Sequence, residues 1–306
     1  MTWSEESLHA WLQEREAPQP LVGSRGHDAA VLAEQVGRPV LCVDQTIEGV
    51  HFEAGTQAQR VGRKAAARAL SDLAATAAQP YALLLSLSAP PAAEEAWMRA
   101  AIEAVDQEAR RFGAALVGGD LACVEAPLML SVSALGTLAG SQRSPGRDRG
   151  QAGEVLLLSG PLGGSLLGRH LEIEPRVELG QWLFEHGARV LMDVSDGLAR
   201  DLERIARASS LRIDLEEIPL HADALVAAAG SGRSPQEHAL HDGEDHELLA
   251  TLSASAWQGL AAEAQRRFPG LQAIGKLQAG SGLWIAEGPG AEARRWEGQG
   301  GWLHGA

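Results

Sequence analysis

Residues 39–78 have the sequence PVLCVDQTIEGVHFEAGTQAQRVGRKAAARALSDLAATAA, in which an apolar segment is followed by an alanine-rich one. The apolar residues 39–43 predict a strand that ends at Asp44. Residues 60–78 have a helical period and many alanines, which predict a long helix that carries Asp72. A strand followed by a helix is the repeating unit of an α/β protein.

The alternation of strands and helices continues on both sides of this stretch. Short apolar runs predict further strands, and segments with a helical period predict further helices. The expected helices are residues 5–13, 92–112, 163–170 and 198–208, and the expected strands are residues 114–117, 128–135, 155–159, 190–194, 211–215 and 248–252. Both halves of the chain are therefore predicted to have an α/β (α+β) fold.

The length of the chain predicts two domains. Its 306 residues are more than one hydrophobic core usually spans. Residues 140–153 are polar, contain glycine and are locally basic, which is typical of a mobile loop or a domain linker. We therefore expect an N-terminal domain at residues 1–139, a linker at residues 140–153 and a C-terminal domain at residues 154–306.

The composition is that of a globular protein with an acidic surface. Apolar residues make up 45% of the chain and charged residues 22%, and the formal net charge is −14. Such a charge repels polyanions, so neither nucleic acid nor an anionic membrane is an expected partner. Phosphate ligands stay possible where divalent cations lie between carboxylates and phosphates. Clustered carboxylates are therefore the informative feature.

The cysteines and the N-terminus predict a cytoplasmic protein. Cys42 and Cys123 match no metal-ligand spacing and no disulfide framework, so we expect buried free thiols in a reducing compartment. Residues 1–6 are acidic and begin no signal peptide. The apolar runs are shorter than a membrane span, so no membrane segment is expected.

Four short acidic motifs lie beside glycine or at the end of an apolar strand. They are GHDAA at residues 26–30, VDQT at 43–46, VGGD at 117–120 and MDVSDG at 192–197. Ligand crevices of α/β proteins lie at strand ends, and glycine lets a phosphate approach the backbone. The alternative is that Asp28 and Asp120 are turn residues and that Ser195 or Asp196 caps a helix. The residues alone leave both interpretations open.

Asp72 lies in an otherwise small and apolar part of its predicted helix. A charge in such a segment has to be paired, bound to a metal or exposed to solvent. The alternative to a ligand role is an ion pair with Arg68, four residues earlier, which is a common surface arrangement. Lys64, two turns before Asp72, can contact a phosphate, but the simpler interpretation is a solvated helix lysine.

Further candidate residues lie in two other segments. His51, in the sequence EGVHF, is either a substrate ligand or an ordinary loop histidine. The sequence DGEDHEL at residues 242–248 holds several carboxylates at the start of a predicted strand. In an extended segment Asp245 and Glu247 share one face and Glu244 lies on the other. A solvated acidic turn is the alternative.

A glycine-rich segment, GPLGGS at residues 160–165, follows a predicted strand and begins a predicted helix. In this setting backbone N–H groups can bind phosphate. The segment has neither the P-loop pattern nor the full Rossmann fingerprint. His221, His238 and His241 form no H-E-x-x-H pattern, so no zinc site is predicted.

Taken in order, these motifs resemble those of the thiamine-monophosphate kinase family. This family belongs to an ATP-binding superfamily with aminoimidazole ribonucleotide synthetase and selenophosphate synthetase. The resemblance runs from Gly26 to the C-terminus. It rests on DQTIEGVHF at residues 44–52, LSDLAA at 70–75, GGD at 118–120, DVSDGL at 193–198 and GEDHEL at 243–248.

The resemblance implies a kinase that transfers the γ-phosphoryl group of ATP directly to thiamine monophosphate, giving thiamine diphosphate and ADP. It implies Mg²⁺ as cofactor and a homodimer that forms through the sheet of the N-terminal, ATP-binding and Mg²⁺-binding domain. The C-terminal α/β domain is expected to close over the nucleotide. No phosphoenzyme is expected.

The resemblance also assigns roles to individual residues. The implied Mg²⁺ ligands are Asp28, Asp44, Asp72, Asp120, Asp193 and Asp196, of which Asp72, Asp120 and Asp196 are the expected catalytic residues. The implied ATP-binding residues are Gly119, Asp120, Arg147 and Ser195. The implied thiamine-phosphate ligands are His51, Glu244 and Trp302.

Some residues differ from the family pattern. His27 stands where the family usually has an aspartate, Val43 where it often has a hydroxyl residue, Gln45 where threonine is common, and Ala69 in place of asparagine. The alternatives to the kinase are another reaction of the same superfamily and a non-catalytic nucleotide-binding paralogue. A selenophosphate synthetase is disfavoured because no cysteine precedes Cys42.

Overall fold

The structure is a computed structural model that describes residues 3–22, 29–286, 292–298 and 300–302. The chain divides into two compact units. The first unit consists of residues 1–73, 78–141 and 171–174, and the second of residues 74–77, 142–170 and 175–306. The domain boundaries that we expect around residues 140–153 stay a prediction.

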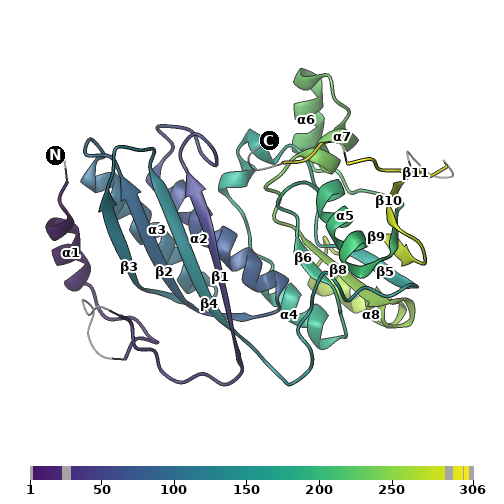
Figure 1. The fold of residues 1–306 in the computed structure, drawn as a ribbon, viewed down its shortest axis with the longest axis horizontal. Helices are drawn as coiled ribbons and strands as arrows, with labels where there is room; N and C mark the ends of the chain where they lie inside the picture. The colour runs from purple at the N-terminus through teal and green to yellow at the C-terminus, as the bar shows by residue number, and fades with distance from the viewer. Residues whose placement is uncertain (1–2, 23–28, 287–291, 299, 303–306) are drawn as a thin grey trace. The chain divides into compact units, whose positions relative to one another are not determined.

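The first unit contains a four-stranded sheet with the strand order β1-β4-β2-β3. β4 pairs antiparallel with β1 and β2, whereas β2 and β3 are parallel. Helices α2 and α3 lie along one face of this sheet (Figure 1). The elements are α1 (Glu5–Gln13), β1 (Arg38–Ile47), α2 (Ala58–Ala75), β2 (Gln79–Ala89), α3 (Glu95–Arg111), β3 (Ala115–Cys123) and β4 (Met129–Leu138).

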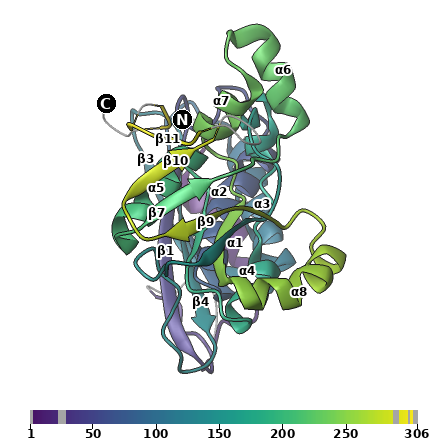
Figure 2. The same ribbon diagram turned by 90° about the vertical axis from the view of Figure 1, so that its right-hand side faces the viewer.

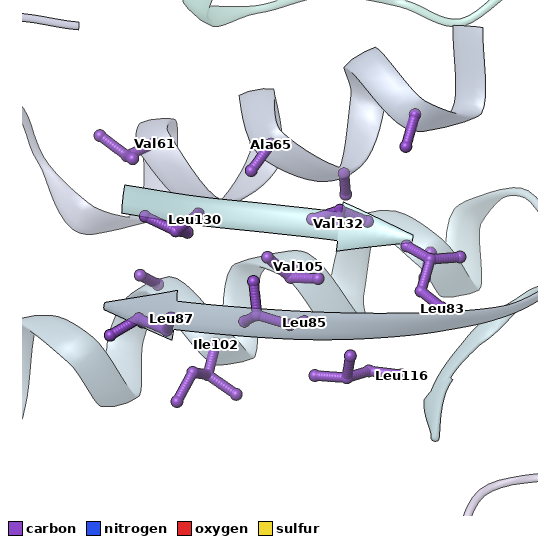
Figure 3. Packing of buried hydrophobic residues seen from close by; sticks show 14 of the residues in the cluster. Val61, Ala65, Leu83, Leu85, Leu87, Ile102, Val105, Leu116, Leu130 and Val132 are labelled. Carbon is purple, nitrogen blue, oxygen red and sulfur yellow. The ribbon is translucent and has the colours of Figure 1, made fainter. Parts of the chain in front are cut away.

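The core of the first unit lies between the sheet and these two helices. Successive residues of β4 alternate between buried and half-buried, so the helices cover only one face of the strand. Figure 3 shows this packing, with Leu130 of β4, Val61 of α2 and Ile102 of α3 among the core side chains. The opposite face of the sheet, here called the open face, is less covered.

The helix predictions for the first half are confirmed. The helix expected at residues 5–13 is α1 with the same bounds. The helix expected at residues 60–78 is α2, which begins two residues earlier and ends three residues earlier, and the helix expected at residues 92–112 is α3, which is shorter at both ends. The strand expected at residues 114–117 overlaps only the beginning of β3, and the strand expected at residues 128–135 covers most of β4.

The prediction that Asp44 ends its strand was wrong. β1 continues to Ile47 because β4 pairs with it along its whole length, from Arg38 to Ile47. β2 was not predicted, although it lies between β4 and β3 in the sheet. Its buried Leu83 and Leu87 belong to the core, and this pairing between distant segments is not visible in a local pattern.

The second unit contains a seven-stranded mixed sheet with the strand order β11-β10-β7-β9-β5-β8-β6. Figure 2 shows β10, β7 and β9 side by side. The elements are β5 (Glu154–Leu158), α4 (Val177–Glu185), β6 (Leu191–Asp193), α5 (Leu198–Ser209), β7 (Arg212–Leu215), α6 (Ala222–Ser231), α7 (Pro235–His241), β8 (Leu248–Ser253), α8 (Ala254–Arg267), β9 (Gln272–Gln278), β10 (Gly282–Ile285) and β11 (Arg294–Arg295). The predicted α/β (α+β) fold class is confirmed.

The helix expected at residues 163–170 was wrong. Two short 3₁₀ turns, Ser165–Leu167 and Arg169–Leu171, occupy that place. Gly163, Gly164 and Gly168 have φ values of 95°, 71° and 130°, and such positive angles interrupt an α-helix. The strands and the helix expected between residues 155 and 252 are β5, β6, α5, β7 and β8.

Within the described part of the chain, every helix is too short or too polar to cross a lipid bilayer.

Candidate functional site

The D-V-S-D-G segment forms the turn between β6 and α5. Asp193 is the last residue of β6, and α5 begins at Leu198. Gly197, with a φ of 102°, is the N-cap residue of α5 and has no side chain that can cap it. The interpretation of Ser195 or Asp196 as the helix cap is therefore wrong. We call residues 193–197 the acidic turn.

Asp201, in the first turn of α5, holds the acidic turn in place. Its side chain is fully buried, and its carboxylate accepts hydrogen bonds from the backbone N–H groups of Ser195 at 3.0 Å and Asp196 at 3.1 Å. Arg204 bridges two carboxylates, at 2.7 Å from Asp201 and 2.5 Å from Asp196. Burial raises the pKa of Asp201 to about 7, against the opposing effect of Arg204.

Sequence reasoning missed Asp201. The available signal was an acidic residue in the first turn of a helix, where the helix dipole favours a negative charge. That signal is common on surface helices. Only the structure shows that this carboxylate turns inward to the preceding loop.

The G-E-D-H-E-L segment pairs with the acidic turn. The N–H group of Glu244 donates to the carbonyl of Ser195 at 2.8 Å, and that of His246 donates to the carbonyl of Val194 at 2.8 Å. Glu244 and His246 have φ values of 61° and 51°, which few residues other than glycine adopt. The extended segment that would place Asp245 and Glu247 on one face is therefore not formed.

Asp245 and Glu247 are buried, with 6% and 7% of their surface exposed, so a solvated acidic turn was the wrong interpretation for both. Asp245 lies 2.7 Å from the Arg169 guanidinium. Glu247 lies 2.5 Å from the Arg176 guanidinium and also accepts the hydroxyl of Ser159. Buried carboxylates of this kind need such partners, and here the partners anchor the segment.

His246 contacts the acidic turn through its side chain as well. Its Nδ1 atom lies 2.9 Å from Oδ2 of Asp193, and both residues are buried. This contact orients the carboxylate of Asp193. No local pattern predicts this contact, because the two residues lie in motifs that are far apart in the chain.

Residues 300–302 lie on the same turn. The backbone N–H group of Trp302 donates to the carbonyl of Asp196 at 2.9 Å, and the Arg200 guanidinium donates to the carbonyl of Gly300 at 2.7 Å. Half of the surface of Trp302 is exposed. The second unit thus brings together Asp193, Ser195, Asp196, Glu244 and Trp302.

The glycine-rich segment does not have the predicted phosphate-binding arrangement. The N–H group of Gly163 donates to Asp245 at 3.2 Å, and that of Gly164 donates to Asp242 at 2.9 Å. The protein's own carboxylates therefore engage both groups. Elsewhere in this unit Arg147 is exposed, and its carbonyl accepts the Ser209 hydroxyl at 2.7 Å.

In the first unit, Asp44 lies on the face of β1 that α2 covers. The Arg68 guanidinium, which the sequence offered as a partner for Asp72, donates to Oδ1 of Asp44 at 2.8 Å. Asp72 itself is half-buried on α2. Its expected ligand role stays a prediction.

Asp120 lies on the open face, opposite to the face of Asp44. The register aligns Asp44 with Val132 and Asp120 with Ser86, and residues aligned in this way share a face. A cavity of about 660 Å³ is lined by Gly119, Asp120 and Ser86 together with apolar residues. The expected ATP-binding residues of this unit therefore border a cavity.

His51 lies in the turn after β1. Its Nδ1 atom accepts the backbone N–H group of Ile47 at 3.0 Å, and its carbonyl accepts the ammonium of Lys64 at 2.5 Å. Lys64 is completely buried, so its interpretation as a solvated helix lysine was wrong. The expected role of His51 as a substrate ligand stays a prediction.

The described carboxylates do not fit a preformed magnesium site within either unit. Nowhere among residues 3–22, 29–286, 292–298 and 300–302 do three or more His, Cys, Asp or Glu side chains form a group that can hold a metal ion. Arginines pair with Asp44 and Asp196, and a histidine contacts Asp193. Asp28, another expected ligand, lies outside the described residues.

Both cysteines are free thiols. Cys42 is half-buried and donates to the carbonyl of Ala69 at 3.3 Å. Cys123 is exposed, so the expectation of a buried thiol was wrong for this residue.

The sequence is similar to a family model and to known proteins. Residues 26–138 match the family model described as AIR synthase related protein, N-terminal domain. A thiamine-monophosphate kinase from Rhodopirellula baltica is 36% identical over 294 residues, which cover 92% of this chain and 91% of that protein.

Solved structures are also similar. The crystal structure of thiamine-monophosphate kinase from Stenotrophomonas maltophilia K279a has a TM-score of 0.77 and 32% identity, and the match covers 94% of this chain and 96% of that one. A structure described as AaThiL complexed with AMPPCP and TMP has a TM-score of 0.77 and 25% identity, over 98% of this chain and 96% of that one.

The pKa of Asp245 makes the stability of the chain depend on pH. Burial raises this pKa to about 6, and Glu247 adds to the rise, whereas Arg169 and the N–H group of Gly163 lower it. An unfolded aspartate has a pKa near 3.9, so between about pH 4 and pH 6 the folded chain holds a proton that the unfolded chain releases. The free energy of unfolding should therefore fall as the pH rises through this window, by roughly 3 kcal/mol from this group.

Urea unfolding at pH 4, 5, 6 and 7 measures this effect. Asp245→Asn has a neutral side chain at every pH, as the protonated carboxyl has, and should therefore flatten the pH dependence of the free energy of unfolding between pH 4 and pH 6. The control Asp148→Asn changes an exposed aspartate, and its free energy of unfolding should depend on pH as that of the wild type does. An equally steep dependence in Asp245→Asn would show that Asp245 is not its source.

Proposed function

This chain belongs to the thiamine-monophosphate kinase family, and we propose that it transfers the γ-phosphoryl group of ATP to thiamine monophosphate, giving thiamine diphosphate and ADP. A relative of that name aligns with nearly the whole chain. The structural observation that carries the proposal is the convergence of the acidic turn, the G-E-D-H-E-L segment and Trp302 in the second unit.

The reaction needs alignment and charge neutralisation more than a covalent nucleophile. A phosphate oxygen of thiamine monophosphate forms the new bond to the γ-phosphorus, and the bond from that phosphorus to the bridging oxygen of ADP breaks. The attacking oxygen is already anionic at neutral pH, so no general base has to remove a proton. The residues therefore act by holding the two substrates.

We assign the substrates to the residues as the family resemblance implies. ATP is held by Gly119, Asp120, Arg147 and Ser195, and thiamine monophosphate by His51, Glu244 and Trp302. A cationic thiazolium is favoured beside a carboxylate such as Glu244 and over an indole face such as that of Trp302. The exposed half of Trp302 is available for such a contact.

Mg²⁺ is the proposed cofactor. Because the described carboxylates form no preformed site, we propose that the ion arrives as the Mg²⁺ complex of ATP. The proposed ligands are Asp28, Asp44, Asp72, Asp120, Asp193 and Asp196. We also propose a cytoplasmic location, where ATP is available and the free thiols of Cys42 and Cys123 stay reduced.

The direct test is to incubate the protein with ATP, Mg²⁺ and thiamine monophosphate and to measure thiamine diphosphate by chromatography. We expect product in proportion to enzyme and none after addition of EDTA. Bound ATP without any product would contradict the kinase and support a non-catalytic nucleotide-binding protein.

Asp72→Asn should reduce product formation by about a hundredfold or more, since a lost charge interaction in the transition state costs several kcal/mol. The melting temperature should change little, because Asp72 is half-buried on the surface of α2. Near-normal activity of this variant would contradict a catalytic role of Asp72 and would show that it is an ordinary surface residue.

We further propose a homodimer that forms through the open face of the first sheet. Leu41, Val43 and Leu84 expose 74%, 62% and 45% of their surface on this face. Their neighbours on β1, β4 and β2 are uncharged. Two chains with a net charge of −14 each repel one another over most surfaces, so an uncharged apolar face is the favourable place for a second copy.

Light scattering coupled to size exclusion tests the dimer. The wild type should have twice the chain mass of 32.2 kDa, and Leu84→Glu should elute as a monomer, because the new charges would face each other without partners. Leu225→Glu, which changes an exposed leucine of α6, should remain dimeric. A monomeric wild type, or a dimeric Leu84→Glu, would contradict this interface.

A further inference from the structure

Lys64 of α2 has no exposed surface, although a lysine side chain almost always reaches solvent. Its ammonium donates to the main-chain carbonyl of His51 at 2.5 Å. An apolar residue of similar volume often serves a protein core at least as well as a buried charge. Stability alone therefore does not explain a lysine at this position. Its contact with His51 points to a functional reason.

The turn that contains His51 fixes the imidazole ring. The carbonyl of Ile47 accepts the N–H groups of Val50 at 3.1 Å and His51 at 2.8 Å, and the N–H group of Ile47 donates to Nδ1 of His51 at 3.0 Å. Because Nδ1 accepts a hydrogen bond, the hydrogen of the neutral ring lies on Nε2. His51 is thereby prepared to donate a hydrogen bond through Nε2.

The residues on both sides of His51 are anchored. Phe52 is buried and stacks on Trp97, with ring centroids 6.5 Å apart. Glu48 and Leu128 exchange two hydrogen bonds, at 2.9 Å between backbone groups and 3.3 Å through the Glu48 carboxylate. Lys64 adds a further point of attachment at the carbonyl of His51 itself, between these two anchors.

We propose that Lys64 is a positioning residue for His51, an inference that rests on the proposed function. Its ammonium holds the His51 carbonyl, and with it the ring, so that Nε2 donates to a phosphate oxygen of the acceptor substrate. The buried charge also favours an anion nearby, because a charge in the interior is screened less than one in water. The ligand class is a phosphate monoester, and the effect is specific to the acceptor.

Steady-state kinetics of Lys64→Met, which keeps the length of the side chain but not its charge, test the proposal. The KM for thiamine monophosphate should rise about tenfold, as for the loss of one hydrogen bond to an anion. The kcat and the KM for ATP should stay within about twofold of the wild type. Lys64→Arg, which keeps a cation, should recover part of the loss.

Two further variants separate positioning from mere support of the fold. Arg60→Met, one turn earlier on α2, removes an exposed ion pair with Glu172 and should leave all constants unchanged. His51→Ala should abolish the effect of Lys64→Met, so that the double variant is no worse than His51→Ala alone.

Additive effects of the two substitutions would overturn the proposal. So would a lower melting temperature of Lys64→Met with an unchanged KM for thiamine monophosphate, or an equal rise of both KM values. If Lys64→Met does not fold, Lys64→Gln, which keeps a neutral donor, serves in the same comparison. If the wild type forms no thiamine diphosphate, the proposed function is refuted. If the wild type is active and Lys64→Met has an unchanged KM for thiamine monophosphate, only the positioning role is refuted.

Discussion

The candidate site of the second unit depends on the hydrogen bonds that the buried carboxylate of Asp201 accepts. It accepts the backbone N–H groups of two successive residues of the acidic turn, Ser195 and Asp196. Buried backbone N–H groups need a partner, and a turn that leaves a short strand has none from the sheet. Through Arg204 the same carboxylate also fixes the side chain of Asp196.

The neighbouring segments depend on the acidic turn. The G-E-D-H-E-L segment donates to the carbonyls of Val194 and Ser195, and the N–H group of Trp302 donates to that of Asp196. Left-handed φ angles at Glu244 and His246 are costly for these residue types, and the structure keeps them by burying the carboxylates beside them against Arg169 and Arg176. Such strain, held by surrounding contacts, is common where a backbone positions functional groups.

The sequence predicted the fold class and the elements α1, α2, α3, α5, β1 and β3 to β8, because these strands and helices leave a local hydrophobic period. It did not predict α4, α6, α7, α8, β9, β10 or β11. It did not predict β2, the inward carboxylate of Asp201, the burial of Lys64 or the pairing of Arg68 with Asp44. Each of these depends on contacts between segments distant in the chain, which no local period encodes. Short patterns also misled: the glycines at residues 163 and 164 suggested a phosphate-binding helix start, whereas their N–H groups donate to Asp245 and Asp242.

The order of five motifs was more informative than any single motif, and it indicated the family that the relatives support. The motifs did not reveal how each aspartate is held. The structure shows Asp44, Asp193 and Asp196 paired with side chains of the protein, so a metal ion would have to compete with these contacts. That competition is the reason why we propose that Mg²⁺ arrives as its complex with ATP.

Amide hydrogen exchange at Ser195 and Asp196, followed by NMR in the wild type and in Asp201→Ala, tests the central claim most directly. We predict slow exchange of both amides in the wild type and at least about tenfold faster exchange in the variant, since each loses its buried acceptor. The amides of β5, in the same unit, should exchange equally slowly in both proteins. Unchanged protection of Ser195 and Asp196 in Asp201→Ala would contradict the claim that this carboxylate holds the acidic turn.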